Sequence, residues 1–241
     1  MAQITLTDRD YNQSNLQYIN FALSELFSQT NTVSELSRAG SRAVLTVTCP
    51  DEYAEIIKKE VCDKASDVIA VNYKYDYFKK LINTSGLNAV EKELLLTSLI
   101  AADLDEDKRY TASRLFCYGN MVLDGVFNFR LKPLKTKWAG IVNCMPEYFQ
   151  GEQLKDFITY LLEDRKRRVF VEGDKVYDSH YRRLIKGELM DKGMEDGKII
   201  REILLSGCGE VEVNCPLPKT DEHYLKEYFG DKIILGKGYF S

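Results

Sequence analysis

The stretch that decides the fold class is GEVEVNCPLPKTDEHYLKEYFGDKIIL, residues 209–235. Valines alternate with acidic residues over 210–214, which is the period of a strand with one buried face. Residues 221–229 predict a helix that Thr220 caps and a glycine ends, and 232–235 predict a last strand. A strand, a helix and a strand in this order predict a βαβ unit with parallel strands and a right-handed crossover.

The residues before this unit predict a β-hairpin. Two β-rich runs, 168–172 and 175–177, flank the two-residue turn Gly173-Asp174. A helix is expected over 198–205. The C-terminal part of the chain, 166–241, is therefore predicted to combine a hairpin with a βαβ unit.

The centre of the chain, 66–165, predicts a helical region. Its apolar residues recur three and four positions apart, which is the period of an amphipathic helix. Asn88 and Glu91 have the spacing of a capping box. The expected helices cover 68–82, the residues after Asn88, 105–117, the residues after Pro133, and 153–162.

The N-terminal part, 1–65, predicts a strand, a helix, a second strand and a second helix. Residues 31–38 are polar and are expected to form a loop. The fold class is therefore α/β or α+β. We expect the N-terminal strand–helix unit and the C-terminal βαβ unit to share one small mixed sheet, with the central helices beside it, as three regions or one compact domain.

Composition limits the function classes. The chain has 241 residues, 44% of them hydrophobic, and 33 basic against 37 acidic residues, a net charge of −4. This acidic excess argues against nucleic acid as a partner, because binders usually carry excess positive charge. No signal-peptide pattern opens the chain, and no stretch approaches the ~20 apolar residues of a membrane span. We therefore expect a cytoplasmic protein whose six cysteines are free thiols.

The metal-binding patterns are incomplete. Asp103, Asp105 and Asp107 open a calcium-loop pattern, but Lys108 and Arg114 stand where that loop needs glycine and glutamate. The spacings among Cys208, Cys215 and His223 match no standard zinc site. We therefore expect no metal.

The catalytic patterns are incomplete as well. Residues 193–199 are one residue short of a phosphate loop, and Ile199 lacks the hydroxyl that such a loop supplies to magnesium. No serine lies in a nucleophile-elbow motif. We therefore expect no cofactor and do not expect an enzyme.

The densest basic run is Arg165-Lys166-Arg167-Arg168. It follows a predicted helix, where cations complement the helix dipole. The alternative is contact with nucleic acid or anionic lipid.

The candidate binding surface lies in DGVFNFRLKPLKTKW, residues 124–138. In an extended chain the two phenylalanines face one way, and Asn128 and Arg130 face the other. The planar guanidinium of Arg130 suits a carboxylate or a phosphate. Asp124 could equally be its internal partner, in which case the segment is structural. The candidate residues are Asp124, Asn128, Arg130, Lys132 and Trp138.

This segment also carries a resemblance, together with VNYKY (71–75), ELLLTSLIAAD (93–103), DEDKRY (105–110) and QLKDF (153–157). These stretches resemble the YtxC-like family of sporulation-associated proteins from endospore-forming bacteria. The similarity covers roughly residues 65 to 241 and is densest over 124–135. It implies a link to sporulation, and the family offers no established activity and no catalytic residues to carry over. The basic run at Arg165 has no counterpart in the family.

Two hypotheses follow for the function. The first is a cytoplasmic interaction or regulatory protein of spore development with an unknown protein partner. The second is an enzyme of unrecognised type that uses dispersed acidic residues, with Arg130 as an anion clamp. The second predicts a deep pocket with converging polar groups.

Overall fold

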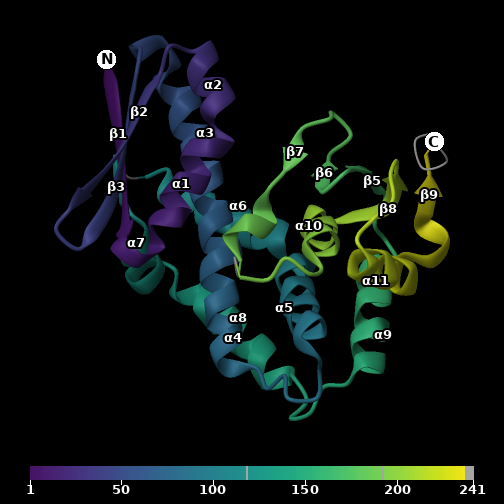
Figure 1. Cartoon of the computed structure of the whole chain (residues 1–241). Helices are drawn as coiled ribbons and strands as arrows, with labels where there is room; N and C mark the ends of the chain where they lie inside the picture. The colour runs from purple at the N-terminus through teal and green to yellow at the C-terminus, as the bar shows by residue number, and fades with distance from the viewer. Residues whose placement is uncertain (118, 191–192, 237–241) are drawn as a thin grey trace. The chain divides into compact units, whose positions relative to one another are not determined.

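The computed structural model describes residues 1–117, 119–190 and 193–236 (Figure 1). The chain forms two compact units, and each unit is built from two separate segments of the sequence. Unit 1 contains Met1–Lys74 and Asp105–Asn143, and unit 2 contains Tyr75–Leu104 and the residues from Cys144 onward. Each unit combines helices with one small sheet, which confirms the α/β or α+β class.

Unit 1 holds a mixed sheet in the order β2-β3-β1-β4. Its strands are β1 (Ala2–Arg9), β2 (Val33–Ala39), β3 (Arg42–Cys49) and β4 (Asn120–Val122). β1 pairs antiparallel with β3 and parallel with β4. Side chains on β1 and β3 alternate between buried and partly exposed, as expected for a sheet with one face on the core.

The prediction of a loop over 31–38 is wrong, because β2 pairs along its whole length with β3. β2 is polar and largely exposed, since it is an edge strand with little contact to the core. Backbone pairing with β3 holds it, and no apolar alternation marks it in the sequence.

The helices of unit 1 cover the core side of this sheet. α1 packs on β1 and β3, and Leu16 and Ile19 of α1 are fully buried with Leu6 and Leu45 of the strands. α3 continues through a π-helical turn (Val68–Tyr73) into α4. The helices are α1 (Gln13–Ala22), α2 (Ser24–Gln29), α3 (Ala54–Asp67), α6 (Leu104–Leu115), α7 (Leu123–Arg130) and α8 (Lys132–Cys144), with 3-10 turns at Asp10–Asn12 and Asp51–Tyr53.

Unit 2 holds a sheet in the order β7-β6-β5-β8-β9. Its strands are β5 (Arg167–Glu172), β6 (Lys175–Tyr177), β7 (Arg183–Leu184), β8 (Cys208–Val213) and β9 (Ile233–Leu235). The β5–β6 hairpin has the predicted two-residue turn, with Gly173 at φ 62°. β8, α11 (Lys219–Phe229) and β9 form the predicted parallel βαβ unit.

The helices of unit 2 are α4 (Lys74–Leu81), α5 (Ala89–Ala102), α9 (Gly151–Leu162), α10 (Lys198–Ser206) and α11, with 3-10 turns at Lys186–Leu189 and Gly230–Lys232. α4 begins with the last residue of unit 1. The predicted capping box opens α5: the Asn88 side chain accepts from the Glu91 N–H at 2.9 Å, and Glu91 accepts from the Asn88 N–H at 2.8 Å. Thr220 does not cap α11, which begins at Lys219 after Pro218; its hydroxyl lies 3.4 Å from Asp196 instead.

The expectation that the N-terminal and C-terminal strands share one sheet is wrong. The N-terminal strands belong to the sheet of unit 1, and the C-terminal strands belong to that of unit 2. Each sheet is completed by short strands that the pattern did not reveal, β4 in the first and β7 in the second. Two or three residues carry too little periodicity to mark a strand.

Candidate functional site

The segment over 124–138 folds as two helices. α7 ends at Arg130, and α8 starts at Lys132 with Pro133 in its first turn, where the missing N–H of proline costs no hydrogen bond. The extended form considered around Asn128 and Arg130 is therefore wrong, whereas the helix predicted after Pro133 is confirmed. Leu123 and Val126 of α7 are buried at helical spacing, and Phe129 is 75% exposed.

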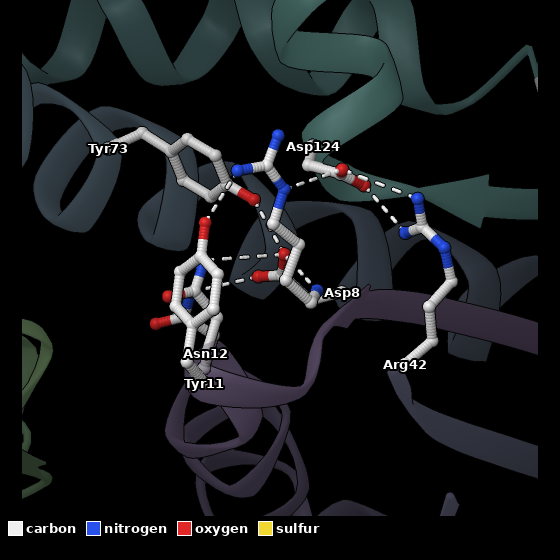
Figure 2. Close-up of polar contacts among 8 residues, drawn as sticks. Asp8, Tyr11, Asn12, Arg42, Tyr73 and Asp124 are labelled. Carbon is white, nitrogen blue, oxygen red and sulfur yellow. Dashed lines mark hydrogen bonds and ion pairs between the residues drawn. The ribbon is translucent and has the colours of Figure 1, made fainter. Parts of the chain in front are cut away.

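Asp124 opens α7 and is held by two arginines from the sheet (Figure 2). Arg42 donates from Nη1 to Oδ1 at 2.8 Å and from Nη2 to Oδ2 at 3.4 Å, and Arg9 donates from Nε to Oδ2 at 3.1 Å. We call Arg9, Arg42 and Asp124 the Asp124 clamp. Burial raises the pKa of Asp124, but the hydrogen bonds from Arg42 and Arg9 outweigh burial, so the pKa lies below its usual value.

The alternative in which Asp124 is the internal partner of Arg130 is wrong, because Asp124 binds Arg9 and Arg42 instead. Arg9 and Arg42 face each other across the β1–β3 pair, and two like charges in such a pair repel. The carboxylate between them removes that repulsion and ties α7 to the end of the sheet. A contact between β1, β3 and α7 joins distant parts of the sequence, so no local pattern reveals it.

Beside the clamp, the carboxylate of Asp8 is fully buried and accepts four hydrogen bonds. The donors are the Arg9 N–H at 2.8 Å, the Asn15 amide at 2.9 Å, the Tyr73 hydroxyl at 2.7 Å and the Asn12 amide at 3.4 Å (Figure 2). We call this the Asp8 network. Burial and the neighbouring charge of Asp8 raise the pKa of Tyr73.

The Asp8 network was missed in the sequence analysis. One signal was available, since Asp8 continues the inward-facing positions of Ile4 and Leu6 on β1. A carboxylate at a core position needs internal donors. The network joins β1, α1 and the π-helical turn, and π-helical turns are frequent at functional sites. Here each of the four bonds ties the carboxylate to its own chain, which makes the network an architectural element.

Trp138 is fully buried and belongs to a third polar group in unit 1. Its Nε1–H donates to Asp107 Oδ2 at 2.8 Å, and the Lys74 ammonium binds the same oxygen at 2.8 Å. Lys137 binds Oδ1 at 2.9 Å. We call these four residues the Asp107 cluster. The ring of Phe127 lies 5.7 Å from that of Trp138, so the cluster fixes the start of α8 beside α7.

The other candidate residues lie between these two anchors. Asn128 is half-buried, and its carbonyl oxygen accepts from Lys135 at 3.3 Å. Arg130 and Lys132 are exposed. Neither side chain forms a hydrogen bond or ion pair within the residues that the structure describes. We call Phe129, Arg130 and Lys132 the α7–α8 surface.

The incomplete metal and thiol patterns have structural roles. Asp107 serves the Asp107 cluster, and the part of the chain that the structure describes contains no group of three metal-ligating side chains placed to hold an ion. Cys208 is buried and faces the Ile203 carbonyl oxygen at 3.6 Å. Burial raises its pKa to about 11, which keeps it a thiol rather than a reactive thiolate.

The start of α10, where the sequence resembles a phosphate loop, is capped from within the chain. Gly197 adopts φ 72° just before the helix. Asp221 accepts from the Ile200 N–H at 2.9 Å. A carboxylate of the chain therefore already occupies the place that an anion would take.

Arg165 and Arg168 of the basic run are bound to groups of the chain. Arg165 donates to the carbonyl oxygens of Leu161 and Ala101, both at 2.9 Å. Arg168 donates to Glu210 at 2.8 and 3.0 Å. Lys166 and Arg167 are exposed.

Unit 2 contains a pocket of about 260 Å³ among β6, β7, the turn at Lys186–Leu189 and α10. At its wall the buried Glu202 carboxylate accepts the Lys186 and Gly187 N–H groups at 2.9 and 2.5 Å. Burial raises the pKa of Glu202 despite those bonds. Arg130 is not among the lining residues, so this pocket does not supply the site that the enzyme hypothesis requires.

Comparisons with protein-family models, with curated proteins and with solved structures find no match for this chain. Within residues 1–117, 119–190 and 193–236, no helix has the length and apolar character to cross a membrane.

Proposed function

We propose that this protein acts by binding a protein partner through the α7–α8 surface. The observation that carries the proposal is the 75% exposure of Phe129, a large aromatic side chain near the end of α7. Arg130 and Lys132 flank it, and both are exposed. Aromatic residues, phenylalanine among them, and arginine are enriched at the centres of protein interfaces.

Charge defines the partner segment. The exposed charges of the surface, Arg130 and Lys132, are both positive. The carboxylate of Asp124 is already paired with the two arginines of the clamp. An acidic segment with one apolar side chain complements this surface. Covering the Phe129 ring contributes about 1.5–3 kcal/mol, and the charges accelerate association more than they strengthen the complex.

The anchors on either side support this role. The Asp124 clamp fixes the start of α7, and the Asp107 cluster fixes α8. A surface held rigid before binding loses little conformational entropy when the partner docks. The polar groups of unit 1 thus support a binding surface rather than carry out chemistry.

The resemblance to sporulation-associated proteins supports spore development as the setting. The test is a deletion strain of the endospore-forming host, complemented with the wild-type chain or with Phe129→Ala/Arg130→Ala. We expect the deletion to lower the count of heat-resistant spores and the double variant to fail to restore it, at wild-type protein abundance.

The matched control is Tyr160→Ala, which removes another exposed aromatic ring, 74% exposed on α9. This control should restore the spore count fully. Normal sporulation of the deletion strain would rule out spore development as the setting. A double variant that restores the spore count would rule out the α7–α8 surface as the binding site.

A further inference from the structure

The sheet of unit 2 carries an aromatic cluster on the face opposite its buried valines. Val169, Val171 and Val211 point to the core, and the side chains between them point the other way. These include Phe170 of β5 and Tyr177 of β6, both half-buried. Tyr181 lies on them, with its ring 5.2 Å from Phe170 and 6.0 Å from Tyr177.

The loop that carries Tyr181 is built to hold that ring in place. Asp178 accepts the His180 N–H at 2.8 Å and the Arg182 N–H at 3.0 Å, and its second oxygen binds the Arg182 side chain. Tyr181 itself adopts φ 58°, a left-handed conformation that costs free energy for a residue with a side chain. Its ring nevertheless remains 57% exposed, so the chain constrains it without covering it.

The charged groups nearest the Tyr181 hydroxyl are carboxylates. Glu172 Oε1 lies 3.5 Å from the hydroxyl. Partial burial, Glu172 and Glu212 all raise the pKa of Tyr181. Arg168 binds Glu210 at 2.8 Å and lies 3.7 Å from Glu212. The single positive charge of Arg168 is therefore shared between the carboxylates of Glu210 and Glu212.

We propose that this face binds the arginine or lysine side chain of a basic partner segment, with the cation over the exposed ring of Tyr181 and Glu172 and Glu212 as its counter-charges. A guanidinium over a tyrosine face is attracted by the negative charge density of the ring. The occupant differs in charge from the acidic segment that suits the α7–α8 surface. The site therefore stands independently of that surface.

A single-stranded nucleic acid is the main competitor, because aromatic rings on a sheet also stack bases. Such platforms surround the rings with cations that follow the phosphates. Here Arg168 is bound to Glu210 at 2.8 Å, and Arg183, which pairs with Tyr177, is bound to Glu188 at 3.1 Å. The carboxylates beside the Tyr181 ring, Glu172 and Glu212, favour a cation.

The test is a titration of the ¹⁵N-labelled full chain with N-acetyl-L-arginine N-methylamide, followed by NMR. We expect shifts confined to the signals of Phe170, Glu172, Tyr177, Tyr181 and Glu212. The citrulline analogue has the same shape without the charge, so it should give no such shifts. Tyr181→Phe should bind within about twofold of the wild-type chain, and Glu212→Gln should weaken binding about two- to fivefold.

Tyr181→Asn removes the ring with a residue that tolerates positive φ and should abolish the shifts. Tyr160→Ala, in the same unit, should leave them unchanged. Equal shifts with the citrulline analogue, unchanged binding by Tyr181→Asn, or tighter binding of an oligouridylate at the same face would each overturn the proposal. Glu212→Gln and Tyr181→Phe keep the test decisive should Tyr181→Asn disturb the hairpin.

Discussion

The two ends of α7 carry opposite charges with opposite roles. Asp124 at its start is buried and held by two arginines. Arg130 at its end is exposed and forms no ion pair within the residues described. A charged side chain of α7 therefore stabilises the fold where the chain supplies an ion-pair partner, and it remains available for binding where the chain supplies none. The predictions below test that division, beginning with the largest expected effect.

The Asp107 cluster should be the most costly part to break. Asp107→Asn removes the buried carboxylate that the fully buried Lys74 ammonium contacts at 2.8 Å. We expect a loss of about 3–5 kcal/mol in the free energy of unfolding, measured by urea denaturation. Glu106→Gln is the control, since Glu106 binds Lys137 at the surface with its own side chain 68% exposed; its effect should stay within about 0.5 kcal/mol. Equal effects of the two substitutions would contradict the account.

The Asp124 clamp comes next. Asp124→Asn removes the charge that two partly exposed arginines share, and should lower the free energy of unfolding by about 1–2 kcal/mol at pH 7.

The pH dependence of this loss has a defined sign. The folded pKa of Asp124 lies below its unfolded value, so its contribution is complete above the unfolded pKa and disappears as pH falls through the folded pKa. The difference between wild type and Asp124→Asn should therefore shrink below about pH 4. A difference that grows on acidification would show that the clamp does not hold in solution.

A single substitution in the Asp8 network should lower the free energy of unfolding by less than the substitutions above. Tyr73→Phe removes one of four donors to Asp8 and keeps the ring that lies 4.9 Å from Phe127. We expect a loss of about 1 kcal/mol, visible as a lower urea midpoint. A neutral result would mean that the remaining three donors satisfy the carboxylate.

The α7–α8 surface should contribute least to stability. Phe129→Ala and Arg130→Ala each truncate an exposed side chain, so the free energy of unfolding should change by less than about 0.5 kcal/mol. A loss above about 2 kcal/mol for either variant would place the residue in the architecture and end its candidacy as a binding residue.

Local patterns predicted the local features of the fold. The alternating valines of β8, the capping box at Asn88 and the Gly173-Asp174 turn each depend on residues close in sequence. β2 was missed because its pairing with β3, and not its composition, makes it a strand. The shared sheet was a wrong prediction about long-range pairing, which periodicity does not specify.

The candidate site shows the same limit. The sequence drew attention to the segment that contains α7 and α8 and predicted the helix after Pro133, but it gave the part that forms α7 an extended form. It did not reveal that Asp124 binds Arg9 and Arg42, which lie 115 and 82 residues away in sequence. Nor did it show that Trp138 is buried while Phe129 is exposed. These distinctions depend on tertiary packing alone.

The central claim is that the exposed end of α7 serves binding and not folding. The most direct test is Arg130→Glu, which reverses the charge at an exposed position, introduced into the deletion strain at wild-type abundance. We expect the count of heat-resistant spores to fall to the level of the deletion while the urea midpoint of the purified variant stays at that of wild type. A wild-type spore count at that abundance would contradict it.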